Sequence, residues 1–124
     1  MQSLYIRKTI RGLRMNEEMN LEGVVSINWQ DVAAEEAAPG ITQRVLWQGD
    51  NDKRVMVFEF KPGAVYPGLD VHEPGPEQVF VISGVFNDGK NDHKAGTFIH
   101  HPAGTSHMPQ SKTGCVLLVI YPEG

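Results

Sequence analysis

The chain has 124 residues, which is enough for one domain with a single hydrophobic core and too few for two. Its formal net charge at pH 7 is −4, and because the basic residues crowd near the N-terminus the rest is acidic, without a basic stripe that would suit nucleic acid. The single cysteine excludes an internal disulfide and a closed cysteine-rich zinc site, and it fits a reducing cytoplasm.

The first 20 residues predict a basic, disordered tail, followed by one domain over residues 21–124. No apolar stretch of the length that a secretory signal needs follows the basic residues, which are Arg7, Lys8, Arg11 and Arg14. Translation from Met15 or Met19 is an alternative interpretation of this start. No apolar run approaches the roughly 20 residues that span a bilayer, so the sequence predicts a soluble, cytoplasmic protein.

Further along, residues 32–38 form an Ala- and Glu-rich run that predicts a short helix, with Asp31 as its N-cap and Pro39-Gly40 as its end. Thirteen glycines and eight prolines then indicate many turns between short strands. Apolar runs predict six strands, at residues 42–48, 54–61, 77–83, 85–87, 97–101 and 115–121, with Gly84 ending the third. This pattern indicates an all-β sandwich or barrel.

Two of the predicted strands are apolar at consecutive positions, over residues 55–58 and 116–120, so both faces of their sheet are expected to be covered. In a small β domain the outer face is covered by another chain or by the N-terminal segment. We therefore expect a homodimer, with a monomer wrapped by its own N-terminal segment as the alternative. Cys115 begins the second run and is expected to be a buried strand residue.

Two segments near the middle of the chain carry potential metal ligands at fixed spacing. The first reads D-x-H-x4-E-x6-G and the second reads G-x5-P-x-G-x2-H, with potential ligands Asp70, His72, Glu77 and His107. Asp70 and His72 are two residues apart, so in an extended strand they point to the same side. The turn at Pro74-Gly75-Pro76 lets Glu77 face back toward His72, and the turn after Pro102 returns the chain with His107.

Two imidazoles and one carboxylate, from His72, Glu77 and His107, suit Fe(II) with open positions or a catalytic zinc ion. If Asp70 also binds, the preference shifts toward Fe(II) or Mn(II); the alternative for Asp70 is to cap the turn at Pro67-Gly68. We expect one divalent ion per chain, with Fe(II) favoured and Zn(II) or Mn(II) as alternatives.

Other residues are candidates for the surroundings of this site. His100 and His101 lie on opposite faces of one predicted strand, so at most one of them faces the interior, where it would support the ligands or contact a substrate. His93 is expected in an exposed loop. Phe80, Phe98 and Met108 are candidates for the wall of a substrate pocket. The alternative is that they only pack in the hydrophobic core.

The two segments resemble the two motifs of the cupin superfamily. Residues 77–86 and 101–109, together with Gly114-Cys115, are similar to the cupin-like domain of ChrR-type anti-sigma factors, and the resemblance covers roughly residues 40–121. At Asp70 the chain departs from the family pattern, which has histidine there. The resemblance implies a double-stranded β-helix, that is, a jelly-roll barrel.

The resemblance also implies a function, although one fold hosts many chemistries. Related small cupins include dioxygenases that cleave diketones and hydroxylated aryl ketones, which implies a mononuclear metal dioxygenase acting on a small diketone or hydroxyketone. The alternative is a non-catalytic sensing or regulatory module. ChrR-type proteins join this domain to a helical zinc-binding domain, and residues before 40 hold no His or Cys for that role, so we expect no direct sigma-factor inhibition. A third hypothesis is an isomerase or hydrolase that uses zinc as a Lewis acid.

Overall fold

The computed structural model describes residues 18–124, so Met15 and most of the predicted basic tail lie outside the described residues. In chain order the elements are the 3-10 turn η1 (Trp29–Asp31), the strands β1 (Glu35–Ala38) and β2 (Ile41–Gln48), the 3-10 turn η2 (Asp50–Asp52), and the strands β3 (Arg54–Phe60), β4 (Ala64–Val65), β5 (Asp70–Val71), β6 (Glu77–Asn87), β7 (Asp92–Lys94), β8 (Phe98–His101), β9 (Ser106–His107), β10 (Gln110–Ser111) and β11 (Cys115–Tyr121).

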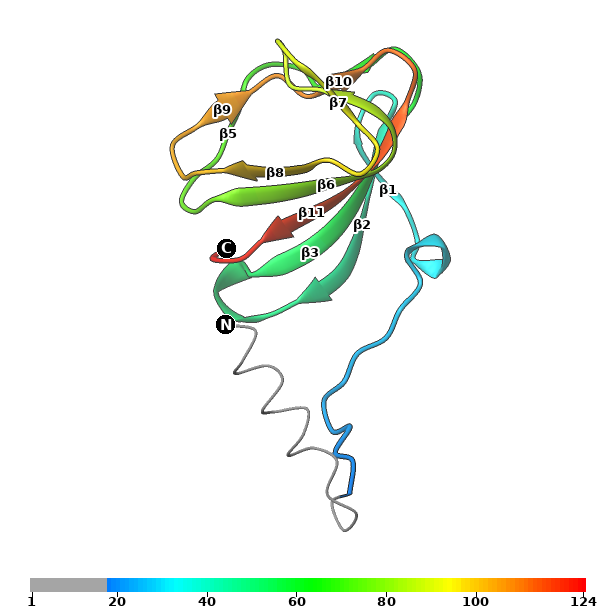
Figure 1. The fold of residues 1–124 in the computed structure, drawn as a ribbon, viewed down its shortest axis with the longest axis vertical. Coiled ribbons are helices and arrows are strands. Elements are labelled where there is room, and N and C mark those ends of the chain that lie inside the picture. The colour runs from blue at the N-terminus through cyan, green and yellow to red at the C-terminus, as the bar shows by residue number, and fades with distance from the viewer. Residues whose placement is uncertain (1–17) are drawn as a thin grey trace.

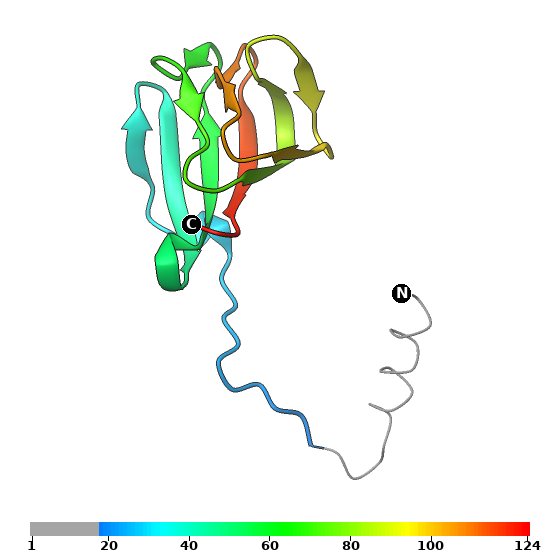
Figure 2. The same ribbon diagram turned by 90° about the vertical axis from the view of Figure 1, so that its left-hand side faces the viewer.

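The strands form one large curled sheet and one small ladder (Figure 1). The large sheet has the order β1-β2-β3-β11-β6-β10-β4, with β7 and β8 also paired to β6, and the ladder joins β5 to β9. All of these pairs are antiparallel. Figure 2 shows the sheet bending round on itself, so that strands from the middle and the end of the chain enclose a common interior.

The hydrophobic core fills this interior. Leu117 of β11 lies beside Phe58 of β3 and Val81 of β6, and because residues two apart in a strand share a face, Val119 and Val79 join them one step along. Leu117, Val119, Val79 and Val81 are all buried. Alternate residues of the central strands therefore stabilise the barrel from within.

The predicted helix over residues 32–38 is wrong. The structure has η1 just before it and the strand β1 within it, where Glu35 pairs with Gln43 and Ala38 with Ile41. Asp31 is the last residue of η1, whose N-cap is Asn28. Helix propensity of an Ala-rich run is worth only tenths of a kcal/mol per residue, so pairing with the edge of a sheet overrides it.

The strand predicted to end at Gly84 in fact continues to Asn87. Gly84 has φ of +75°, and a β-carbon at this position would clash with the Gly114 carbonyl oxygen. Glycine therefore lets β6 pass close to Gly114 and Cys115 of the neighbouring chain segment without ending, since this backbone conformation is costly for other residues. As a result β6 reaches both ends of the barrel and pairs with β11, β8, β7 and β10.

No helix in residues 18–124 is long and apolar enough to cross a membrane. The predicted burial of Cys115 is confirmed: its side chain is 5 % exposed, and burial raises the pKa of the thiol to about 11. The thiol is thus kept protonated.

Candidate metal centre

One strand pair and two backbone hydrogen bonds beside it bring three of the predicted ligands together. In the β5–β9 ladder Asp70 lies directly opposite His107, although the two residues are far apart in the sequence. The backbone of His72, just after β5, accepts a hydrogen bond from Gly104 N at 2.8 Å and donates one to Thr105 O at 2.9 Å. Backbone hydrogen bonds therefore hold residues 70–72 beside residues 104–107.

Glu77 is the first residue of β6, and its carboxylate points into the same space. Its Oε2 lies 3.7 Å from His72 Nδ1, and its Oε1 lies 3.8 Å from His107 Nε2. His107 Nε2 is also 3.1 Å from Asp70 Oδ2, within hydrogen-bond range. One donor atom from each of the four residues lies within 4.8 Å of the other three, which is close enough for one ion to contact all of them after small side-chain shifts.

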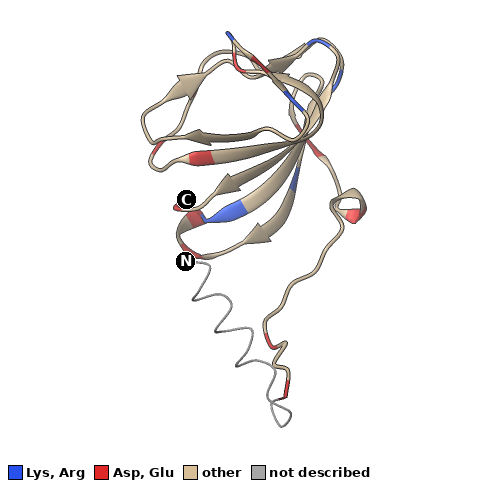
Figure 3. Cartoon of the chain, in the orientation of Figure 1, with Lys and Arg blue, Asp and Glu red and all other residues tan. Residues whose placement is uncertain are grey.

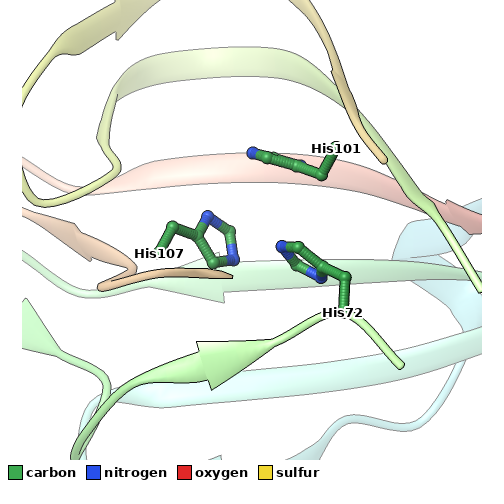
Figure 4. A group of neighbouring side chains, drawn as sticks. All are labelled: His72, His101 and His107. Atoms are coloured by element: carbon green, nitrogen blue, oxygen red, sulfur yellow. The ribbon is translucent and has the colours of Figure 1, made fainter. Parts of the chain in front are cut away.

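A fifth residue, His101, joins this group (Figure 4). Its ring stacks on that of His72 with a centroid distance of 4.7 Å and lies 4.5 Å from that of His107. Its Nδ1 is 3.6 Å from Glu77 Oε1. His72, His101 and His107 form a second group whose donor atoms lie within 4.8 Å of one another.

The sequence placed at most one of His100 and His101 in the interior, and the structure places His101 there and His100 on the exposed face. What the sequence lacked was the register: β8 pairs with β6 so that His101 lies opposite Glu77. Since directly opposite residues share a face, that pairing makes His101 a neighbour of the ligand group.

The electrostatics of the group are set by burial and by hydrogen bonding. The hydrogen bond from His107 holds the pKa of Asp70 below its ordinary value. Burial raises the pKa of Glu77 to about 7 and lowers that of His101 to about 4. Burial also lowers the pKa of His72, so the imidazoles of His72 and His101 are neutral near pH 7, the form in which histidine binds metals.

Three ring nitrogens in the group are buried and have no hydrogen-bond partner within residues 18–124: His72 Nε2, His101 Nδ1 and His107 Nδ1. A buried polar atom without a partner costs about 1–3 kcal/mol, so several together in one place require an explanation. A divalent ion among neutral imidazoles and carboxylates would provide one, and this mixed nitrogen and oxygen set suits Fe(II), Mn(II) or Zn(II). The residues therefore fit a bound metal ion.

Three of the four predicted ligands line a cavity of about 190 Å³ inside the barrel, and His72 does not. Asp70, Glu77 and His107 line it together with Tyr66 and Tyr121. The rest of its wall is mostly apolar and includes Ile41, Phe58, Phe60, Phe86, Leu117 and Val119. The cavity thus combines a few polar groups with a mostly apolar wall, as small-molecule sites do.

The three predicted pocket residues lie elsewhere. Phe80, Phe98 and Met108 are 40 %, 58 % and 45 % exposed on the outer surface and do not line this cavity. Alternation along β6 and β8 explains two of them, because Phe80 and Phe98 lie opposite each other on the face that points away from the interior.

His93 is not in an exposed loop as predicted. It lies in β7, partly buried, with Nε2 2.9 Å from Asp88 Oδ2. Burial of Asp88 opposes its ionisation, but hydrogen bonds from His93 and from the backbone N–H groups of Asn91 and Lys90 lower its pKa to about 2. This pair braces the turn between β6 and β7 and takes no part in the metal group.

Comparisons with known proteins agree with this architecture. Residues 22–122 match the family model of the ChrR cupin-like domain. Comparison with curated proteins gave no significant match. Solved structures with the same fold include KdgF from a Halomonas species, with 22 % identity and a TM-score of 0.68 over 81 % of this chain and 94 % of that one.

Two further structures represent different functions on this fold. The polyketide cyclase RemF from Streptomyces resistomycificus has 22 % identity and a TM-score of 0.69, covering 82 % of this chain and 80 % of that one. The anti-sigma factor ChrR from Rhodobacter sphaeroides, solved in complex with SigE, has 15 % identity and a TM-score of 0.66, covering 94 % and 75 %. At these identities the likeness concerns the fold, which is that of the cupin double-stranded β-helix. With the family model matched over residues 22–122, the chain belongs to the ChrR cupin-like domain family.

Proposed function

We propose that this protein is a small metal-binding cupin that acts as a mononuclear non-haem metal dioxygenase on a small diketone or hydroxyketone. His72, Glu77, His107 and Asp70 would hold one divalent ion, with Fe(II) favoured over Zn(II) and Mn(II). The observation that carries this proposal is the meeting of these four donors, among unpartnered imidazole nitrogens, with Asp70, Glu77 and His107 lining a mostly apolar cavity. A bound Fe(II) ion would supply redox chemistry with dioxygen and Lewis-acid binding of a carbonyl oxygen.

The protein's own residues would prepare the site for such a substrate. The apolar wall, with Phe58, Phe60 and Leu117, suits the hydrocarbon part of a small ketone and excludes water from it. The partly buried Tyr121 lines the same cavity beside Glu77 and limits the orientations open to its carboxylate. Burial raises the pKa of Tyr121, so its hydroxyl remains a donor.

His101 would act from beside the ion. Its stacking on His72 limits the rotation of that ring, and its neutral imidazole adds no charge to the cavity. Because its donor atom lies within 4.8 Å of those of His72 and His107, it is also the residue that would replace Asp70 if that carboxylate moved away.

Oxygen consumption tests the enzymatic part of the proposal. The iron-loaded protein would be mixed under air with a set of β-diketones and hydroxylated aryl ketones, and oxygen uptake would be followed with an electrode. We expect turnover that is lost in His107→Ala and kept in His100→Ala, which changes a histidine on the exposed face. Absence of uptake from the whole set, with iron bound, would contradict it.

The alternative function is a non-catalytic sensing or regulatory module. Its support is the family match and the likeness to ChrR, whose structure this chain matches over 94 % of its length. Full metal occupancy without turnover, together with a small ligand that raises the melting temperature, would favour it. We further propose that the protein forms a homodimer and acts in the cytoplasm, where its buried thiol Cys115 would stay reduced.

A further inference from the structure

The segment of residues 19–28, called the N-terminal arm below, is apolar and stands away from the barrel. Figures 1 and 2 both show it extending outward from η1 with no strand beside it. Five of its side chains are large, apolar and between 51 % and 88 % exposed: Met19, Leu21, Val24, Val25 and Ile27. Contiguous exposed apolar surface of this kind marks an interaction site.

The direction of the arm is fixed where it leaves the barrel. The Arg44 guanidinium of β2 lies 5.1 Å from the ring of Trp29, and Arg44 Nε donates a hydrogen bond of 2.8 Å to the carbonyl oxygen of Val32. Asn28 caps η1 with its side chain. Because these contacts fix residues 28–32, the arm before them extends away from the sheet of its own chain.

The composition of the arm also differs from that of a free solvated tail. Residues 18–43 contain no Lys or Arg, and Figure 3 shows only acidic positions along this stretch. Solvated tails are poor in apolar residues and rich in charge, whereas half of the residues of the arm are large and apolar. This composition is that of a segment whose apolar side chains are covered by another protein surface.

The same chain has an apolar outer face that is only partly covered: Val57 of β3 is 1 % exposed there, whereas Phe80 and Phe98 are 40 % and 58 % exposed. On the side of the large sheet that points away from the core, Leu118 of β11 lies opposite Phe80 of β6, and Phe80 lies opposite Phe98 of β8. Trp47 extends this face onto β2 and is 44 % exposed. Trp47, Leu118, Phe80 and Phe98 are called the outer strip below.

The arm is long enough to cross this strip. Four strand spacings separate β2 from β8 through β3, β11 and β6, which is about 19 Å at about 4.8 Å each. An extended segment with the length of the arm spans about 33 Å. Its apolar side chains can therefore meet the whole width of the strip.

We propose that the arm of one copy packs across the outer strip of a second copy, and that the second copy returns the same contact. This rests on the proposed homodimer and adds where its interface lies. A two-fold arrangement closes on itself and covers both apolar surfaces of both copies in one interface. The metal centre lies inside the barrel and is not part of this contact.

Cross-linking tests the proposal. Ile27→Cys in one preparation would be mixed with Trp47→Cys, Phe80→Cys or Phe98→Cys in another, and oxidised products would be separated on a non-reducing gel. The native Cys115 is buried and serves as the background in wild type. We expect a covalent mixed dimer with at least one strip variant and none with Val65→Cys, which places an equally exposed thiol on β4.

Point variants in the arm give an independent readout. Ile27→Asp should weaken dimerisation by about tenfold or more in sedimentation equilibrium, because it puts a charge into an apolar contact, whereas the adjacent Ser26→Asp should leave it nearly unchanged. A disulfide within one chain of the Ile27→Cys/Phe98→Cys double variant would overturn the proposal in favour of an arm that binds its own sheet. A dimer without arm cross-links would overturn the arm contact alone, and a monomeric wild type would overturn the dimer as well.

Discussion

Replacing Glu77 with Gln removes a buried titratable group and leaves its shape nearly unchanged. The carboxyl is 5 % exposed, and burial raises its pKa to about 7, against 4.5 as its ordinary value. In the metal-free protein the folded state therefore holds a proton at Glu77 that the unfolded chain has already released between these pH values. Its ionisation must weaken the fold as the pH rises through this range.

The size of the effect follows from the two pKa values. The difference between about 7 in the folded protein and 4.5 in the unfolded chain corresponds to roughly 3 kcal/mol of unfolding free energy lost by pH 7. His72 and His101 have lowered pKa values and contribute in the opposite direction, since they protonate more readily in the unfolded chain. Both histidines are present in wild type and in Glu77→Gln, so their contribution largely cancels from the comparison.

Urea unfolding at several pH values measures this difference. With chelator present, the unfolding free energy of Glu77→Gln should exceed that of wild type by an amount that grows from near zero at pH 4.5 to roughly 3 kcal/mol at pH 7. With Fe(II) or Zn(II) added, the order should reverse, because wild type gains the binding energy of the ion and the amide binds it poorly. A difference that stays flat with pH in the metal-free proteins would refute the reasoning.

Other substitutions test the fold. Gly84→Ala should unfold the protein or cost several kcal/mol, because its β-carbon would meet the Gly114 carbonyl. Gly104→Ala, with φ of +85° and open space around it, should cost about 1–2 kcal/mol. Thermal melts of the two variants measure the difference. Leu117→Ala should cost about 2–5 kcal/mol in urea unfolding, since the side chain is 3 % exposed at the centre of the core, and a cost under 1 kcal/mol would contradict its place there. Ser111→Ala should cost about 1–3 kcal/mol, as its buried hydroxyl donates a 2.6 Å hydrogen bond to Val85 O; Ser83→Ala, at an exposed position of β6, is the control.

The long strands could be predicted because their pattern is local. Apolar runs bounded by turns placed β2, β3, β8 and β11 to within a residue at either end. The two-residue strands β5 and β9 have no such pattern, since the ladder exists only because distant turns bring Asp70 opposite His107. Strand β1 was predicted as a helix for a similar reason: its pairing with β2 overrides the helix propensity of the Ala-rich run, and local sequence does not show that pairing.

For the candidate site, too, local sequence patterns predicted one part, whereas another part depends on contacts between distant residues. Spacing within two short segments was enough to select Asp70, His72, Glu77 and His107, which the structure brings together. Finding His101 required the register of β8 against β6, which depends on the closed barrel and not on the residues beside it. The outward direction of Phe80 and Phe98 depends on the same register, so aromatic content alone did not identify the wall of the cavity.

The central claim is that this cluster holds one divalent ion. Elemental analysis of protein expressed without a histidine tag and purified without chelators would report moles of each metal per chain. We expect close to one mole of iron, manganese or zinc in wild type and a loss of most of it in His72→Ala and in His107→Ala, with His100→Ala unchanged as the control. Full metal content in both His72→Ala and His107→Ala, or no metal in wild type, would contradict it.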